Sequence, residues 1–137
     1  MTSPHAASIV RIAGIGGALC GASGVLLGAF GAHALRGHLG DDALALWRTA
    51  VDYQFWHALA LLIVAARVTS ANARILCVAA LGFLCGVLLF SGSLFALALG
   101  APRGVGVVTP FGGAAFAAGW VALLVSFLHA RTESSTR

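Results

Sequence analysis

The sequence contains little charge. Only 9% of its 137 residues are Asp, Glu, Lys or Arg, whereas an ordinary soluble domain has about 25%. Hydrophobic residues make up 60% of the chain, and its mean hydropathy is +0.98. A soluble fold of this size leaves a large fraction of its surface in water, so it could not hide this much apolar area. The composition excludes a soluble globular domain and indicates a protein of the lipid bilayer.

Cysteine is also scarce. Cys20, Cys77 and Cys85 are an odd number without paired spacing, so they predict neither a disulfide framework nor a metal site. We interpret them as small apolar fillers. The sequence has no nucleophile motif, phosphate-binding loop or metal-ligand spacing, and its five histidines are scattered. It therefore predicts no enzyme, no cofactor and no metal.

Lysine is absent, and the eight basic residues are arginines spread along the chain. No face gathers them, which argues against a nucleic-acid partner, and we interpret them as topology signals. One side of the membrane would hold Arg11, Arg67, Arg74, Arg131 and Arg137; the other would hold Arg36, Arg48 and Arg103, beside Asp41, Asp42 and Asp52. The positive-inside rule then predicts that both termini are cytoplasmic.

Long uncharged runs are what the chain has in abundance. Residues 12–35, 75–102 and 104–130 contain no Arg, Asp or Glu. Each run exceeds the roughly 20 residues that a helix needs to cross the bilayer. The run 53–66 is shorter and reaches that length only if its helix includes Asp52. Because the links are short, neighbouring helices should be antiparallel. We predict one all-α membrane domain over 1–137: a small bundle of four antiparallel transmembrane helices at about 9–35, 43–67, 73–100 and 110–129, with a disordered tail at 131–137.

The first apolar run has an alternative interpretation as a cleaved signal peptide. Arg11 would be its weak basic region, and small residues at 18–23 resemble a cleavage site. The apolar run continues to Phe30, however, and Leu19 before Cys20 fits a lipoprotein cleavage site poorly. We therefore predict an uncleaved helix.

The links carry recognisable helix boundary signals. Gly37 is suited to end the first helix, and proline follows a capping residue at Thr109-Pro110, where the fourth helix should begin. The caps expected for the second and third helices are Asp41 or Asp42, and Ser70 or Asn72.

Glycines in the first helix follow a regular spacing of three and four residues. This spacing keeps them on one face, at Gly14, Gly17, Gly21, Gly24, Gly28 and Gly31. Such a face lets another helix approach closely, and the partner is either within the chain or in a second subunit. Small-residue faces are also predicted on the third and fourth helices, centred on Gly82, Gly86, Gly112 and Gly119.

A few polar side chains fall in the predicted outer half of the spans: His33, Asp52, Gln54, His57, Ser91 and Ser93. Ionisable groups within a membrane cost about 2.5 kcal/mol or more and usually face the bundle interior. These residues are therefore a candidate site for handling a proton or ion, or for binding a lipid or small molecule. The structural alternative is an Arg48–Asp52 pair together with a neutral His57 bonded to a serine or a carbonyl.

Several motifs along the chain carry a family resemblance. They are residues 28–35 (GAFGAHAL), Trp47 with 49–51 and 53–54, 57–61 (HALAL), 90–94 (FSGSL), 109–113 (TPFGG), Phe116 and 119–120. Through them, over about residues 14–128, the chain resembles the small inner-membrane family called domain of unknown function 423, which is related to transmembrane protein 256. The resemblance implies a four-helix membrane protein, usually bacterial, with no established activity. The family pattern matches the polar positions His33, His57 and the Ser91–Ser93 turn better than it matches Asp52.

Two functions remain open at this point. The favoured one is a structural or partner subunit of the bacterial inner membrane, surrounded by lipid and packed through its glycine faces, as a homo-oligomer or beside another membrane protein. The alternative is a conduit for protons, ions or a small solute through the outer polar residues. A conduit requires these polar residues to face one another across helices.

Overall fold

Helices make up all the regular secondary structure in the described part of the chain. The computed structural model describes the backbone of residues 3–134 and the side chains of residues 3–129. In order, the elements are α1 (Pro4–His33), α2 (Asp41–Arg67), α3 (Ala73–Gly86), the π-helix η1 (Val87–Ser91), α4 (Gly92–Ala98), the 3-10 helix η2 (Arg103–Val108) and α5 (Thr109–Ser134). Four helical stretches are long and apolar enough to cross a membrane: Pro4–His33, Asp41–Arg67, Ala73–Ala98 and Arg103–His129. The predicted fold class is confirmed.

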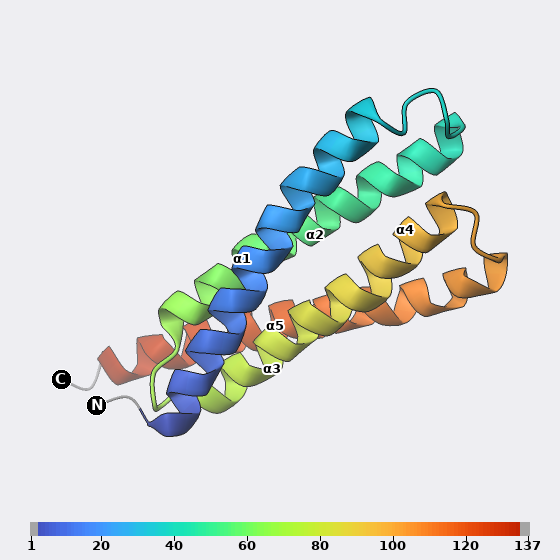
Figure 1. Ribbon diagram of the computed structural model, residues 1–137. Coiled ribbons are helices and arrows are strands. Elements are labelled where there is room, and N and C mark those ends of the chain that lie inside the picture. Colours follow the sequence, from blue (N-terminus) through green and yellow to red (C-terminus); the bar gives the residue numbers. More distant parts are fainter. Residues whose placement is uncertain (1–2, 135–137) are drawn as a thin grey trace.

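The spans form two antiparallel hairpins (Figure 1). One joins α1 to α2, and the other joins the continuous rod α3–η1–α4 to α5. The most extensive contacts lie within each hairpin, between α1 and α2 and between α3 and α5. The hairpins lie together near the two chain ends and diverge toward the opposite end, where the links after α1 and α4 are found. We call these the terminal end and the loop end.

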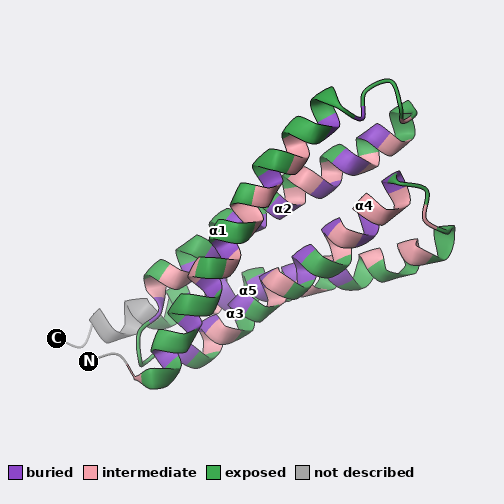
Figure 2. Cartoon of the chain, viewed as in Figure 1, coloured by how far each residue is buried: buried purple, intermediate pink, exposed green. Residues whose placement is uncertain are grey.

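The outer surface of the bundle is apolar, as a lipid environment requires. Exposed residues cover the outward sides of the helices (Figure 2). They include large side chains such as Leu26, Leu88 and Phe111. The main core lies where the hairpins meet and contains Leu61, Leu76 and Phe83. A smaller core near the loop end joins α2 to α4 and comprises Leu35, Leu44, Trp47 and Ala98.

Several helix boundaries differ from the predicted ones. α1 begins at Pro4 because the Ser3 hydroxyl accepts a hydrogen bond from the Ala6 N–H at 3.2 Å and proline suits the first turn. The N-cap of α2 is Gly40 rather than Asp41 or Asp42. Both aspartates lie in the first turn instead, where negative charge is favourable next to the positive end of the helix dipole.

The remaining boundary signals have mixed outcomes. Asn72 occupies the N-cap position of α3, and α5 begins at Thr109. α1 ends at His33 with Ala34 as its C-cap, and Gly37 lies further along the link, with a φ of 93° that suits glycine. The helical backbone of α5 continues to Ser134, whereas the sequence predicted a disordered tail from residue 131. Residues 135–137 lie outside the described range.

Candidate functional site

The predicted outer polar residues do not form one cluster. Gln54, His57, Ser91 and Ser93 are buried, whereas His33 and Asp52 are exposed. The four buried residues fall into separate groups that bond to different neighbours.

His57 is held by a hydrogen bond on each ring nitrogen. Its Nε2 lies 3.1 Å from the indole Nε1 of Trp120, and its Nδ1 lies 2.6 Å from the carbonyl oxygen of Tyr53. An indole N–H can only donate, so Nε2 is the acceptor. The proton therefore sits on Nδ1, which donates to the Tyr53 carbonyl. This network suits a neutral imidazole, and it joins α2 to α5.

Aromatic rings surround His57 on several sides. The ring of Phe116 stacks on the imidazole at 3.5 Å between centroids and an interplanar angle of 11°. Tyr53 of α2 stacks on Phe90 of η1 at 4.5 Å. Phe83 lies 5.5 Å from His57 and 5.2 Å from Trp120, between ring centroids. Sequence reasoning missed the roles of Phe83 and Trp120; the only signal was the four-residue spacing of Phe116 and Trp120, which places them on one helix face.

Gln54 forms a second group with α1. Its side-chain nitrogen donates to the Cys20 carbonyl oxygen at 2.9 Å and to the Ser23 hydroxyl at 2.8 Å. The Ser23 hydroxyl donates in turn to the Leu19 carbonyl oxygen at 2.7 Å. Gln54 therefore joins the two helices of the first hairpin through backbone and hydroxyl acceptors.

The two serines flank Gly92, where the π-helix meets α4. The Ser93 hydroxyl lies 2.9 Å from the Phe90 carbonyl oxygen, to which it donates, and 2.7 Å from the Thr109 hydroxyl. The Ser91 hydroxyl is buried and has no hydrogen-bond partner among the described residues. π-helical turns are frequent at functional sites, so Ser91 is the least explained polar group of the interior.

Asp52 and His33 lie at the outer surface. Asp52 and Arg48 both border a pocket of about 450 Å³ near the loop end, together with Arg36. Within residues 3–129, no ion pair joins Arg48 to Asp52, contrary to the structural alternative derived from their spacing. Both side chains extend outward from α2 into the exposed region. In the same described range, no three His, Cys, Asp or Glu side chains gather as a metal site would need.

The glycine face of α1 is turned toward α2 over its whole length. A Cβ atom on Gly17 would lie 2.9 Å from the Ala58 carbonyl oxygen, and one on Gly31 would lie 2.5 Å from the Trp47 ring. Ordinary contacts with α2 are found at the other four positions, Gly14, Gly21, Gly24 and Gly28, between 3.4 and 3.9 Å. The partner of this face is thus within the chain, and the face gives no reason to expect a second subunit.

The glycines of the second hairpin lie between α3 and α5. A Cβ atom on Gly82 would lie 2.8 Å from the Ala115 carbonyl oxygen, and one on Gly119 would lie 2.7 Å from the Phe83 ring. Gly86 faces the Phe116 ring, and Gly112 faces the Phe90 backbone. These close approaches bring Phe116 and Trp120 near His57.

These features define a class: a small multi-pass helical membrane protein. Residues 27–113 match the family model described as "Protein of unknown function (DUF423)", and the chain belongs to that family. It is 44% identical over 110 residues to UPF0382 membrane protein SH2409 of Staphylococcus haemolyticus, covering 80% of this chain and 89% of the relative. It is 40% identical over 112 residues to UPF0382 membrane protein YwdK of Bacillus subtilis, covering 80% and 90%. No solved structure matches.

A further relative is the UPF0382 membrane protein of Haemophilus influenzae, which is 42% identical over 106 residues, covering 77% of this chain and 85% of the relative. The names of these bacterial relatives state a membrane location and no activity. The resemblance inferred from the motifs is therefore confirmed.

Proposed function

We propose that the protein is a structural or partner subunit of the inner membrane, which acts through contact with another membrane protein. The observation that carries this proposal is the separation of the interior polar groups. Gln54 bonds to α1, His57 to α5 and Ser93 to Thr109, and within residues 3–129 these groups do not bond to one another. A conduit would need them connected, whereas a subunit needs them only to join helices.

The outward side of α1 is the surface best suited to such a contact. α1 is the least buried of the four spans. Its exposed residues Ala18, Ala22 and Ala29 are spaced by four and seven, so they lie along one side of the helix. Small residues in line allow a partner helix to approach closely in a membrane. The occupant is a transmembrane helix, from a second copy or from another protein.

Photo-cross-linking in membranes tests this contact. A photoreactive residue at Ala22 should give a discrete cross-linked band. The same residue at Leu124, which is exposed on α5, is the control and should give none. A second copy would give a band at twice the mass of the chain, and a different partner would give another mass. Cross-links at both positions, or at neither, would contradict the proposal.

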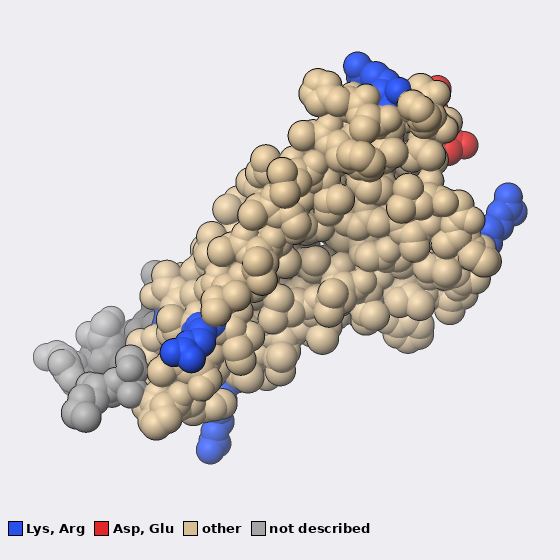
Figure 3. Space-filling view, viewed as in Figure 1, with Lys and Arg blue, Asp and Glu red and all other residues tan. Residues whose placement is uncertain are grey.

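We further propose that both termini are cytoplasmic. Arg11, Arg67 and Arg74 belong to the terminal end, whereas the aspartates Asp41, Asp42 and Asp52 belong to the loop end with Arg36, Arg48 and Arg103. Figure 3 shows acidic atoms only at the loop end of the visible face. The positive-inside rule favours this orientation.

Alkaline phosphatase fused after residue 104 should be active, and green fluorescent protein fused at the C-terminus should fluoresce. The reverse pattern of activity and fluorescence would contradict the orientation.

Ser91 favours a conduit as the second candidate function. Its buried hydroxyl has no hydrogen-bond partner among the described residues. Ser91 is the last residue of the π-helix η1, which packs against α5. Proteoliposomes with a pH-sensitive dye inside would compare wild type with His57→Ala and Ser91→Ala. No proton flux in any of them supports the subunit role. A proton flux that is present in the wild type and lost in the folded variants would contradict the subunit role and support a conduit.

A further inference from the structure

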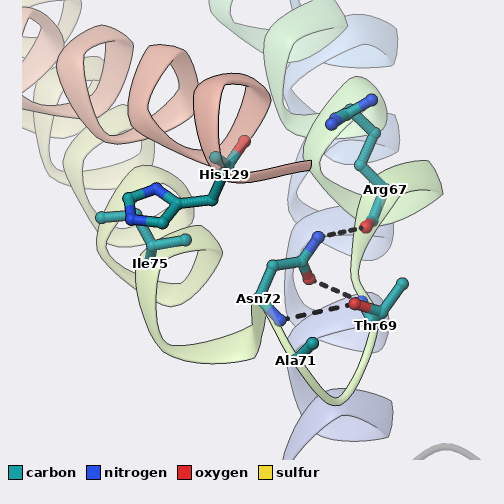
Figure 4. A pocket seen from close by; sticks show the side chains of 7 residues that line it. Arg67, Thr69, Ala71, Asn72, Ile75 and His129 are labelled. Carbon is teal, nitrogen blue, oxygen red and sulfur yellow. Dashed lines mark hydrogen bonds between the residues drawn. The ribbon is translucent and has the colours of Figure 1, made fainter. Parts of the chain in front are cut away.

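A polar pocket opens at the terminal end, apart from the interior groups. Its volume is about 510 Å³, and it lies among the end of α2, the link 68–72, the start of α3 and the last described turns of α5. Figure 4 shows Arg67 and His129 on opposite sides of the pocket, with Asn72 between and below them. Since the pocket lies where three spanning helices end, it is at the depth of lipid headgroups.

The link that forms the floor is held in place by its own hydrogen bonds. The Asn72 side chain accepts from the Thr69 N–H at 2.7 Å and donates to the Arg67 carbonyl oxygen at 3.0 Å. Figure 4 shows both bonds. Asn72 thus holds the turn and positions Arg67 at the pocket edge, so the pocket is formed without a ligand.

The Arg67 guanidinium has no acceptor among the described residues. Its Nε is buried without a hydrogen-bond partner, and its Cζ lies 3.6 Å from the centroid of the Phe127 ring. This cation–π contact fixes the side chain without using its N–H donors. An arginine is always charged and presents five donors in a planar fork. A fixed, charged donor of this kind calls for an acceptor from outside the described chain.

The surrounding charge favours an anion as that acceptor. Arg11 and Arg74 belong to the same end, as do Arg131 and Glu133 in the last turns of α5, and the three aspartates belong to the loop end. The pocket near the loop end differs because the Asp52 carboxylate borders it beside Arg36 and Arg48. A carboxylate in the lining repels an anion, and the lining of the Arg67 pocket has no described carboxylate. Arg11 borders a further pocket, but the Arg11 side chain is exposed, whereas the unpartnered Nε of Arg67 is buried.

We propose that the Arg67 pocket binds the phosphate group of an anionic ligand, with an anionic phospholipid headgroup as the expected source. A guanidinium fork matches two phosphate oxygens in a bidentate arrangement. Arginines next to the ends of spanning helices attract anionic lipids of the adjacent leaflet. Such a lipid would tie the loop 68–72 and the ends of α2 and α5 to the membrane surface. The proposal concerns the isolated protein and does not depend on the proposed partner.

The test uses the full-length protein purified in a non-ionic detergent. Its thermal unfolding is followed with added phosphatidylglycerol, phosphatidylcholine or inorganic phosphate, and native mass spectrometry counts retained lipids. We expect phosphatidylglycerol to raise the Tm of the wild type and phosphatidylcholine to have little effect, since binding to the folded state stabilises it. In Arg67→Gln, the concentration that gives half the rise should increase about tenfold, because the charge-assisted bonds are lost.

Two further variants separate the site from general charge effects. Arg48→Gln removes the same charge beside the pocket that Asp52 borders and should respond like the wild type. Arg67→Lys keeps a cation over Phe127 but loses the fork, so it should fold and give an intermediate response, which preserves the test if Arg67→Gln does not fold. A rise with inorganic phosphate that depends on Arg67 would assign the site to free phosphate. Equal responses in the Arg48 and Arg67 variants, equal effects of both lipids, or no response to any probe would overturn the proposal.

Discussion

Replacing Gly82 with alanine should separate the two helices of the second hairpin. The new Cβ atom would lie 2.8 Å from the Ala115 carbonyl oxygen and 2.9 Å from the Gly119 Cα. These are backbone atoms of a spanning helix, so no rotation of a side chain relieves the contact. α3 and α5 must move apart, and the dispersion contacts along their interface weaken. Overpacking of this kind costs about 1–3 kcal/mol.

Gly92 provides a matched control within the same span. It is also helical, with φ −59° and ψ −45°, and a Cβ atom there would meet nothing within 4 Å. Both substitutions gain the same helix propensity, up to about 1 kcal/mol. The difference in unfolding free energy between Gly82→Ala and Gly92→Ala therefore isolates the steric term, about 1–3 kcal/mol.

Titration of detergent-solubilised protein with a denaturing detergent, followed by circular dichroism, measures this difference. Gly92→Ala should unfold at or above the wild-type midpoint, and Gly82→Ala should unfold below it. Equal midpoints for the two variants would refute the backbone contact between α3 and α5. A lower midpoint for Gly92→Ala alone would show that the turn after η1, rather than the α3–α5 interface, limits stability.

Two other predictions concern the buried hydrogen bonds. Trp120→Phe removes the donor to His57 Nε2 and leaves a buried acceptor, so in the same titration it should destabilise the bundle by about 1–3 kcal/mol. The control Trp56→Phe, at an exposed tryptophan, should change the unfolding midpoint little. Equal losses of stability in the two variants would contradict the bond between Trp120 and His57. Gln54→Leu removes both bonds to α1 and should cost about 0.6–1.7 kcal/mol, which lies between the average and the maximum for interhelical bonds in membranes. An unchanged midpoint for Gln54→Leu would show that glycine packing alone holds α1 against α2.

The existence and approximate limits of the spans follow from the sequence alone. In hydrocarbon, each backbone polar group must be satisfied within its own segment, so an uncharged run of spanning length has to form a helix. The start of α5 at Thr109 and the N-cap position of Asn72 are local as well, because a helix end depends on a few neighbouring residues. The glycine spacing in α1 likewise determines that one side of that helix is smooth.

Which surfaces meet was decided only by the tertiary structure. The smooth side of α1 packs on α2 of the same chain, because spacing along one helix carries no information about its partner. His57 and Trp120 are 63 residues apart, so their bond depends on how the hairpins cross. Depth in the membrane placed Asp52 and His57 in one predicted cluster, but depth does not specify rotation about the helix axis. The rotation of α2 in the bundle turns His57 inward and Asp52 outward.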